Sequence, residues 1–253
     1  MHKEFTALLD RFKKQNIKNS RHFERMSEVS ISYHSAVADD SSLTKEETTN
    51  LLIDGITANG KSLNDQNMVK DYHDALLFTL NLATKKQSLT PRLIQTINAL
   101  LMRTSRSLID DGTNLDKPQS VFRSFSTQQR SFYYANYQRI PLELELLCGK
   151  INHRIKQIQN PEEVYDFAFY AHFYLMNIFP FSDGNRRTAH LLMNYILKYR
   201  HQPLAIVFKE DKADYLKALK KAKTKLQIFR DFMYSQQIKY LSQTDNFIKS
   251  KEN

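Results

Sequence analysis

Two apolar helical faces joined by a short polar loop restrict the fold more than any other feature of this sequence. The residues that mark these faces recur at helical spacing. In one stretch they are Val164, Phe167, Ala168, Ala171, Leu175 and Ile178, and in the next they are Leu191, Leu192, Tyr195, Ile196 and Tyr199, preceded by Thr188. A period of 3.6 residues predicts an α-helix for each stretch. The loop PFSDGN at residues 180–185 joins them. The sequence therefore predicts a helix–loop–helix buried in the core.

Most of the remaining chain also has helical periodicity. The stretches are residues 3–29, 66–84, 91–101, 142–155 and 211–253, and the last is basic. Thr44 and Glu47 form a capping-box pattern that predicts a helix running to about Asp54, and Asn59-Gly60 indicates a turn. Only 5 glycines and 6 prolines occur in 253 residues, which favours long helices over a turn-rich β fold. We expect an all-α protein of one large domain, alone or with appendages.

Residues 111–138 interrupt the helical pattern. Residues 121–126 alternate apolar and polar side chains, which predicts a short strand or hairpin near residues 119–127. This is the one stretch of the sequence for which we expect β structure.

The charge of the chain is unevenly distributed. Residues 1–120 carry 16 Lys and Arg against 15 Asp and Glu, whereas residues 121–253 carry 21 against 12. A basic half favours anionic partners such as a nucleotide, a nucleic acid or an acidic protein, although lysine-rich helix faces can also simply be solvated. The single cysteine, Cys148, excludes a disulfide within the chain. Since no secretory signal or membrane-spanning apolar run occurs either, we expect a cytoplasmic protein.

The loop before the second core helix has the chemistry of a phosphate site. Asp183 is an oxygen ligand suited to Mg²⁺, and Gly184 permits a tight turn. Asn185, Arg186 and Arg187 then open a helix, whose free N–H groups and dipole favour anions. The pattern predicts a site for a magnesium-bound polyphosphate. The alternative is an ordinary capped turn with arginines facing water.

The same residues resemble the signature of Fic-domain proteins, His-Pro-Phe-x-(Asp/Glu)-Gly-Asn-Gly-Arg-x-x-Arg. The positions that match are Pro180, Phe181, Asp183, Gly184, Asn185 and Arg187, and Ala171, His172, Leu175 and Ile178 fit the stretch upstream of the signature. The resemblance extends over about residues 25–220. It implies an all-α Fic-type helical bundle with a β-hairpin flap, and transfer of AMP from ATP to a protein hydroxyl. In that family the motif histidine is the general base, the acidic residue holds Mg²⁺, and the turn binds phosphates.

Three departures from the signature bear on catalysis. Phe179 stands at the histidine position, and a phenyl ring cannot accept a proton. Arg186 replaces the second glycine, a position at which the similar death-on-curing toxins carry lysine. His190 replaces the last arginine, and we expect it to approach a phosphate rather than to serve as the base. For His172 we expect a structural role.

The N-terminal region resembles the inhibitory element of many Fic proteins, Ser-x-x-x-Glu-Gly/Asn. Here Ser35 matches, Asp39 takes the glutamate position and Asp40 the glycine position. One hypothesis is that Asp39 pairs with His190 as a structural clasp. The alternative is that both positions drifted after the activity was lost.

We therefore predict a degenerate Fic-domain protein, inactive in AMP transfer, that retains nucleotide or phosphate binding, with ATP and Mg²⁺ as ligands, and serves a regulatory or interaction role. Its parts would be N-terminal helices with the inhibitory-type element (1–60), a Fic-like core (61–225) and a basic helical tail (226–253). One alternative is an active nucleotide- or phosphotransferase that modifies a protein hydroxyl without the usual base. A second alternative is a nucleic-acid-binding module. The expected partner is a target or regulatory protein, and a homodimer is compatible with the sequence.

Overall fold

The computed structural model describes residues 1–14, 21–106, 121–124, 128–129 and 132–252, and these are overwhelmingly helical. The longer helices are α1 (His2–Lys14), α2 (Arg21–Val37), α4 (Leu63–Thr84), α5 (Pro91–Leu101), α7 (Ile140–Gln157), α8 (Pro161–Ile178), α9 (Asn185–Tyr199), α10 (Lys212–Lys221) and α11 (Leu226–Glu252). Shorter elements are α3 (Lys45–Thr49), which continues as a π-helical turn at Asn50–Asp54, α6 (Arg103–Arg106), and 3₁₀ turns at Tyr137–Arg139 and Lys209–Asp211. The predicted all-α fold is confirmed.

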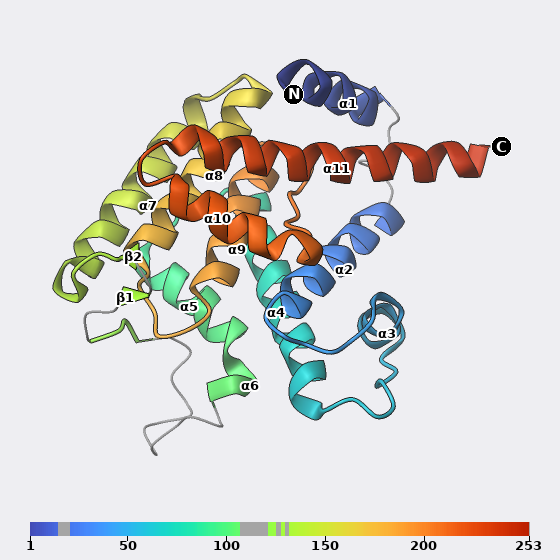
Figure 1. Cartoon of the computed structure of the whole chain (residues 1–253), viewed down its shortest axis with the longest axis horizontal. Coiled ribbons are helices and arrows are strands. Elements are labelled where there is room, and N and C mark those ends of the chain that lie inside the picture. Colours follow the sequence, from blue (N-terminus) through green and yellow to red (C-terminus); the bar gives the residue numbers. More distant parts are fainter. Residues whose placement is uncertain (15–20, 107–120, 125–127, 130–131, 253) are drawn as a thin grey trace.

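Helix α9 is the centre of the bundle (Figure 1). It packs against α8, α4, α5 and α7, and of its residues only Arg186 and Lys198 are not fully buried. The loop at residues 179–184 connects α8 to α9, as the two apolar faces predicted. Because other helices surround α9 on nearly all sides, its first turn has a fixed position at the end of the loop.

Local capping signals set several helix ends. The Thr44 hydroxyl accepts the N–H of Glu47, while the Glu47 carboxylate accepts the N–H of Thr44, so the predicted capping box is confirmed. Thr90 caps α5 and Asn160 caps α8, each followed by a proline at the first helical position. The predicted helix over residues 3–29 corresponds to α1 and the first half of α2, and residues 15–20 lie outside the described part of the chain.

Helices α1 and α11 form an outer layer. In Figure 1, α11 crosses the top of the molecule as its longest helix, and α1 lies along its outer side. Phe5 packs edge-on against Tyr165 of α8 and Tyr234 of α11, which anchors α1 to both helices. Within the residues that the structure describes, no helix has both the length and the apolar character needed to cross a bilayer.

The β-hairpin lies later in the chain than we predicted. Strands β1 (Gln128–Gln129) and β2 (Phe132–Tyr133) pair antiparallel, whereas residues 121–124 form no strand and residues 119–120 and 125–127 lie outside the described part of the chain. Within this segment Arg123 points inward and is 3% exposed. Its backbone N–H donates to the carbonyl of Pro180 at 2.9 Å. This segment is therefore an extended strap along the α8–α9 loop.

Candidate functional site

The α8–α9 loop is shaped by its own side chains. The Asn185 amide receives the N–H of Phe181 at 2.9 Å and donates to the Phe181 carbonyl at 2.8 Å. Asn185 is 3% exposed, so both ends of its side chain are committed to the loop. We had predicted a phosphate-binding role for Asn185. The side chain of Asn185 closes the loop beneath the first turn of α9, and its phosphate-binding role stays a prediction.

Gly184 is required at its position for two reasons. Its φ of 76° lies in the left-handed region, and a Cβ atom there would come within 2.7 Å of Asn98 Nδ2. That nitrogen is already bonded to the Asp183 carbonyl at 3.0 Å and to the Thr188 hydroxyl at 3.1 Å. The tight turn predicted from the sequence is thus fixed from outside the loop by α5.

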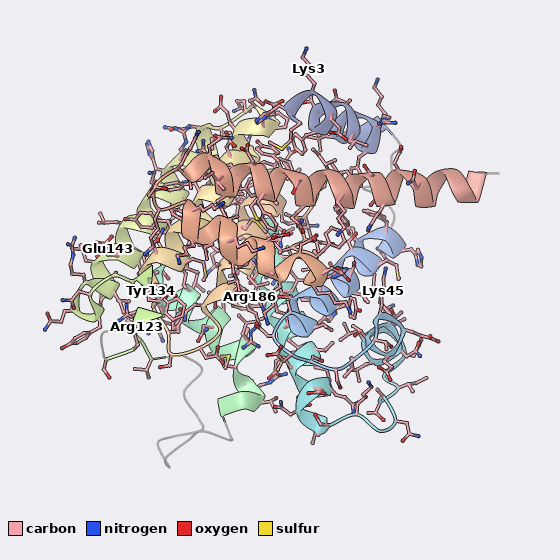
Figure 2. The ribbon with its side chains drawn as sticks, viewed as in Figure 1. Lys3, Lys45, Arg123, Tyr134, Glu143 and Arg186 are labelled. Carbon is pink, nitrogen blue, oxygen red and sulfur yellow. The ribbon has the colours of Figure 1, made fainter. Side chains whose placement is uncertain are left out.

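Arg186 and Arg187 project from the first turn of α9 toward the end of α2, and both pair with Asp39. Arg186 Nη2 forms a short ion pair with one carboxylate oxygen, and Arg187 Nε lies 2.7 Å from the other. The two arginine side chains are only 12% and 4% exposed, whereas that of Asp39 is 26% exposed. Figure 2 shows Arg186 near the middle of the molecule. One carboxylate therefore occupies the place where the forked donors of both arginines would meet an external anion.

Apart from Asp39, the guanidinium group of Arg187 has few hydrogen-bond acceptors near it. Its Nη2 approaches the Met102 sulfur at 3.1 Å and lies 3.8 Å from Asp183 Oδ2, and its buried Nη1 has no hydrogen-bond partner among the described residues. Buried guanidinium donors are normally satisfied. The Nε of Arg187, although 2.7 Å from the Asp39 carboxylate, also makes no hydrogen bond of good geometry, so the site has capacity for a further acceptor.

Asp183 stands at the edge of this site. Its side chain is 69% exposed, and one carboxylate oxygen accepts the N–H of Gly184 at 2.6 Å. No group of three or more His, Cys, Asp or Glu side chains that could enclose a metal occurs among the described residues. Asp183 is therefore a single exposed carboxylate beside a helix N-terminus rather than part of a closed metal centre.

Phe179 ends α8 with a left-handed backbone, φ 50° and ψ 61°. Its ring stacks on Tyr134, with centroids 4.0 Å apart and planes 23° apart, and its carbonyl accepts the guanidinium of Arg123 at 2.7 Å. Arg123 also donates to the carbonyls of Ile178 at 3.2 Å and Ala135 at 2.5 Å. A cation at these last carbonyls satisfies the C-terminal end of α8. In Figure 2, Arg123 and Tyr134 lie together on the hairpin side of Arg186.

The two histidines near the loop are buried behind it. His172 is fully buried and His190 is 5% exposed, and their rings stack with centroids 4.9 Å apart. Burial lowers the pKa of His172 to about 3 and holds the pKa of His190 well below its ordinary value. Both rings are therefore neutral and weakly basic, in the structural role expected for His172. The structure does not bring His190 to the arginines as a phosphate ligand.

The hypothesis of an Asp39–His190 clasp was wrong in its partner. The ion pairs of Asp39 are with Arg186 and Arg187, because the longer arginines reach the end of α2 while His190 turns inward toward His172. Asp40 is 92% exposed in its side chain and pairs with Lys212 at 3.5 Å. Ser35 lies one turn earlier and is buried, 4% exposed.

Four residues of the site were missed from the sequence: Asn98, Met102, Arg123 and Tyr134. All of them come from segments far from the loop in the chain and meet it only through packing. Of these, Arg123 alone carried a local signal, since a charged residue between Phe122 and Phe125 in a largely apolar stretch can point inward.

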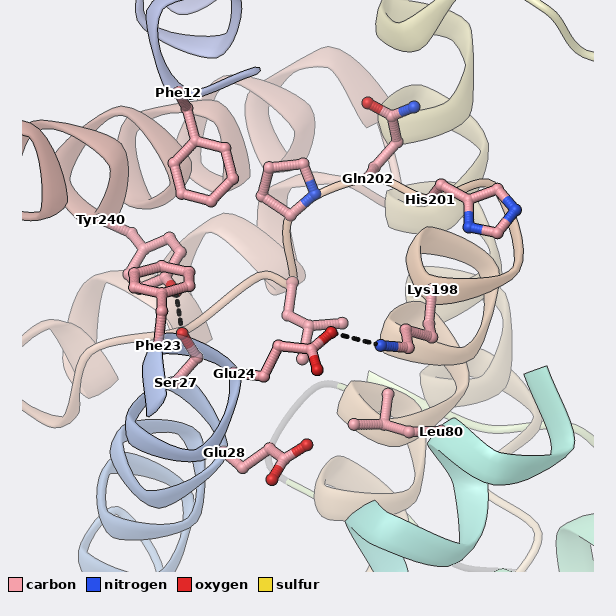
Figure 3. A pocket seen from close by; sticks show the side chains of 12 residues that line it. Phe12, Phe23, Glu24, Ser27, Glu28, Leu80, Lys198, His201, Gln202 and Tyr240 are labelled. Atoms are coloured by element: carbon pink, nitrogen blue, oxygen red, sulfur yellow. Dashed lines mark hydrogen bonds and ion pairs between the residues drawn. The ribbon is translucent and has the colours of Figure 1, made fainter. Parts of the chain in front are cut away.

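A cavity of about 280 Å³ lies away from the loop (Figure 3). Phe12, Leu80 and Tyr240 line it with apolar surface, and the Lys198–Glu24 ion pair of 2.9 Å spans its rim. No residue of the α8–α9 loop contributes to its walls. It is thus separate from the arginine site.

Comparison with known families places a Fic/DOC family model on residues 88–197. Among curated proteins, the protein adenylyltransferase Fic of Nematostella vectensis is 28% identical over 200 residues, and that of Drosophila mojavensis is 27% identical over 192 residues. Each alignment covers 75% of this chain but only 42% and 36% of the relatives, so the chain spans about four tenths of their length.

Solved structures share the fold of the whole chain. A Fic-domain-containing signaling protein of Bacteroides thetaiotaomicron superposes with a TM-score of 0.80 at 22% identity, covering 94% of this chain and 95% of that one. Fic-1 of C. elegans gives a TM-score of 0.79 at 21% identity, covering 99% of this chain and 73% of that one. At these identities the likeness concerns the fold.

Proposed function

This chain contains a Fic domain, and on that premise we propose that it is a nucleotide- or phosphate-binding Fic protein that does not transfer AMP and serves a regulatory or interaction role. Its binding site would be the first turn of α9, with Arg186 and Arg187 as the ligands of the phosphates. In the form described here, Asp39 would hold that site closed.

The position of the Asp39 carboxylate is the observation that carries this proposal. It bridges two arginines that are otherwise nearly buried, at the positively polarised end of a 15-residue helix. A carboxylate is the internal counterpart of a phosphate, because both offer oxygens to forked guanidinium donors. An anion would compete with Asp39, and the unused Nη1 donor of Arg187 favours a ligand with more acceptors than one carboxylate.

The residues around Phe179 support the loss of AMP transfer. A phenyl ring under Tyr134 occupies the position that the family resemblance gives to the base. Neither His172 nor His190 can replace it, because both are buried and stacked on one another. A positioned base is worth about 10²- to 10⁴-fold in rate, so its loss alone reduces transfer to a trace.

The donor set fits ATP with Mg²⁺ as expected ligands. Mg²⁺ is commonly held by one or two carboxylates together with the phosphates of its substrate. Asp183 offers one such carboxylate, exposed and next to the helix N-terminus, and a bound Mg²⁺ would neutralise phosphate charge there. Gly184 and Asn185 would hold the loop in shape rather than touch the ligand.

Calorimetric titration of Mg·ATP and of pyrophosphate tests the proposal with a matched pair of variants. Asp39→Asn removes the competing charge and should tighten binding by about tenfold, corresponding to about 1.4 kcal/mol. Asp40→Asn removes one negative charge at the next residue, which faces solvent, and should leave the affinity unchanged. Arg187→Ala should abolish binding in either background.

Two results would overturn the proposal. Equal affinities for the wild type and Asp39→Asn would mean that Asp39 does not close the site. Transfer of label from α- or γ-labelled ATP to an added protein by the wild type would establish the alternative, an active nucleotide- or phosphotransferase.

A further inference from the structure

A small cavity lies where α2, α4 and α9 meet, one turn before Asp39. Its volume is about 10 Å³. Ser35 of α2, Tyr72 of α4 and His190 of α9 line it, and Ile31 and residues 205–207 complete its walls. The cavity is thus bordered both by α2, which ends two residues before Asp39, and by α9, which carries both arginines.

Three polar atoms around this cavity lack partners. No hydrogen bond of good geometry joins Ser35 Oγ, Tyr72 Oη or His190 Nε2 to a described residue, although the Ser35 and Tyr72 hydroxyls are close enough to interact weakly. The three residues are 4%, 0% and 5% exposed. Buried hydroxyl and imidazole groups are almost always hydrogen-bonded to protein or to ordered water. Three unsatisfied atoms of three different helices around one void therefore have a common explanation.

We propose that a single buried water molecule occupies this cavity and bridges Ser35, Tyr72 and His190. A void of roughly 10–15 Å³ is the least that holds one water, and buried waters typically make about three hydrogen bonds. Burial raises the pKa of Tyr72 to about 12, so its hydroxyl stays protonated and can donate. The water would accept from both hydroxyls and donate to the neutral ring of His190.

The water has a consequence for the site described above, and this part rests on the proposed function. Ser35 precedes Asp39 by four residues, and His190 follows Arg186 by four, so the bridge joins the two helices about one turn from the Asp39 ion pairs. It would hold the end of α2 in register with α9 and so favour the closed site. Loss of the bridge would raise the fraction of molecules with Asp39 disengaged, and apparent anion affinity rises with that fraction.

The first test is a crystal structure of the wild type at a resolution that shows ordered waters. We expect one density peak about 3 Å from Ser35 Oγ, Tyr72 Oη and His190 Nε2. An empty cavity, or direct hydrogen bonds among these three groups, would overturn the proposal.

The second test measures pyrophosphate affinity by calorimetry in Tyr72→Phe, with Ser35→Ala as a second variant. Each should tighten binding about threefold in the wild-type background and leave it unchanged in the Asp39→Asn background, where the clasp is already released. Tyr195→Phe is the matched control, because it removes another tyrosine hydroxyl, one that donates to the Gln87 carbonyl and does not line the cavity.

The possible failures are distinguishable. If Tyr72→Phe and Ser35→Ala have no effect although Asp39→Asn tightens binding, the water has no regulatory role. If no variant binds pyrophosphate, the proposed function and this regulatory role fall together, while the density still decides whether the water is present.

Discussion

Lowering the pH from 7 to 5 should strongly destabilise this protein through its buried histidines. Burial lowers the pKa of His34 to about 4 and that of His172 to about 3, and the pKa of His190 lies well below its ordinary value. In the unfolded chain a histidine titrates near 6.5. Below that pH the unfolded chain binds protons that the folded protein excludes, so stability falls as the pH decreases from about 6.5 to about 4.

The magnitude follows from the separation of the two pKa values. Between pH 7 and pH 5, a histidine whose pKa drops from 6.5 to 4 or below loses about 2 kcal/mol of stability. His34 and His172 each contribute this amount, about 4 kcal/mol together, and His190 adds to the loss in the same direction. This loss is comparable with the whole stability of a typical domain, about 5–15 kcal/mol.

Urea unfolding followed by circular dichroism at pH 7, 6 and 5 measures this loss. His172→Phe keeps a flat ring between Phe229 and His190 and should reduce the loss by about 2 kcal/mol. His22→Gln, on the exposed start of α2, serves as the control and should leave the pH dependence as in the wild type. An unfolding free energy that stays constant from pH 7 to pH 5 would refute the reasoning.

The loop itself yields two further predictions. Gly184→Ala should destabilise the protein by about 1–3 kcal/mol, because the turn needs a left-handed backbone and the new Cβ would meet Asn98 at 2.7 Å; a thermal midpoint equal to that of the wild type would contradict this. Asn185→Ala should cost about 2–4 kcal/mol by leaving both backbone groups of Phe181 buried without partners, as measured by urea unfolding, whereas Asn185→Asp, which keeps the acceptor, should cost less.

The parts of the fold that could be predicted from the sequence depend on short-range interactions. The capping box of Thr44 and Glu47 lies within four residues. The amide of Asn185 that closes the loop is equally local, but the residue type alone did not distinguish this role from phosphate binding. Helical periodicity of apolar residues likewise identified α8 and α9, because a buried helix must be apolar around most of its surface.

The contacts that define the site depend on long-range packing, which no local pattern encodes. Residues 186, 187 and 190 lie within about 100° of one another around a helix, so spacing alone could not select the partner of Asp39. Asp39 pairs with Arg186 and Arg187, because the ring of His190 stacks on His172 instead. Arg123 donates hydrogen bonds to carbonyls 55 and 56 residues away. These hydrogen bonds, rather than strand pairing, explain why its side chain points inward.

The stack of Tyr134 on Phe179 covers the position that the family resemblance gives to the base, so on the proposed function a return to activity would need more than one substitution. A single substitution that restored histidine at residue 179 would still leave that position covered by a ring at 4.0 Å. An incoming hydroxyl could reach the new imidazole only after a second change removed or moved Tyr134. Because the first of these two steps alone brings no gain in rate, selection for activity has no gradual path back.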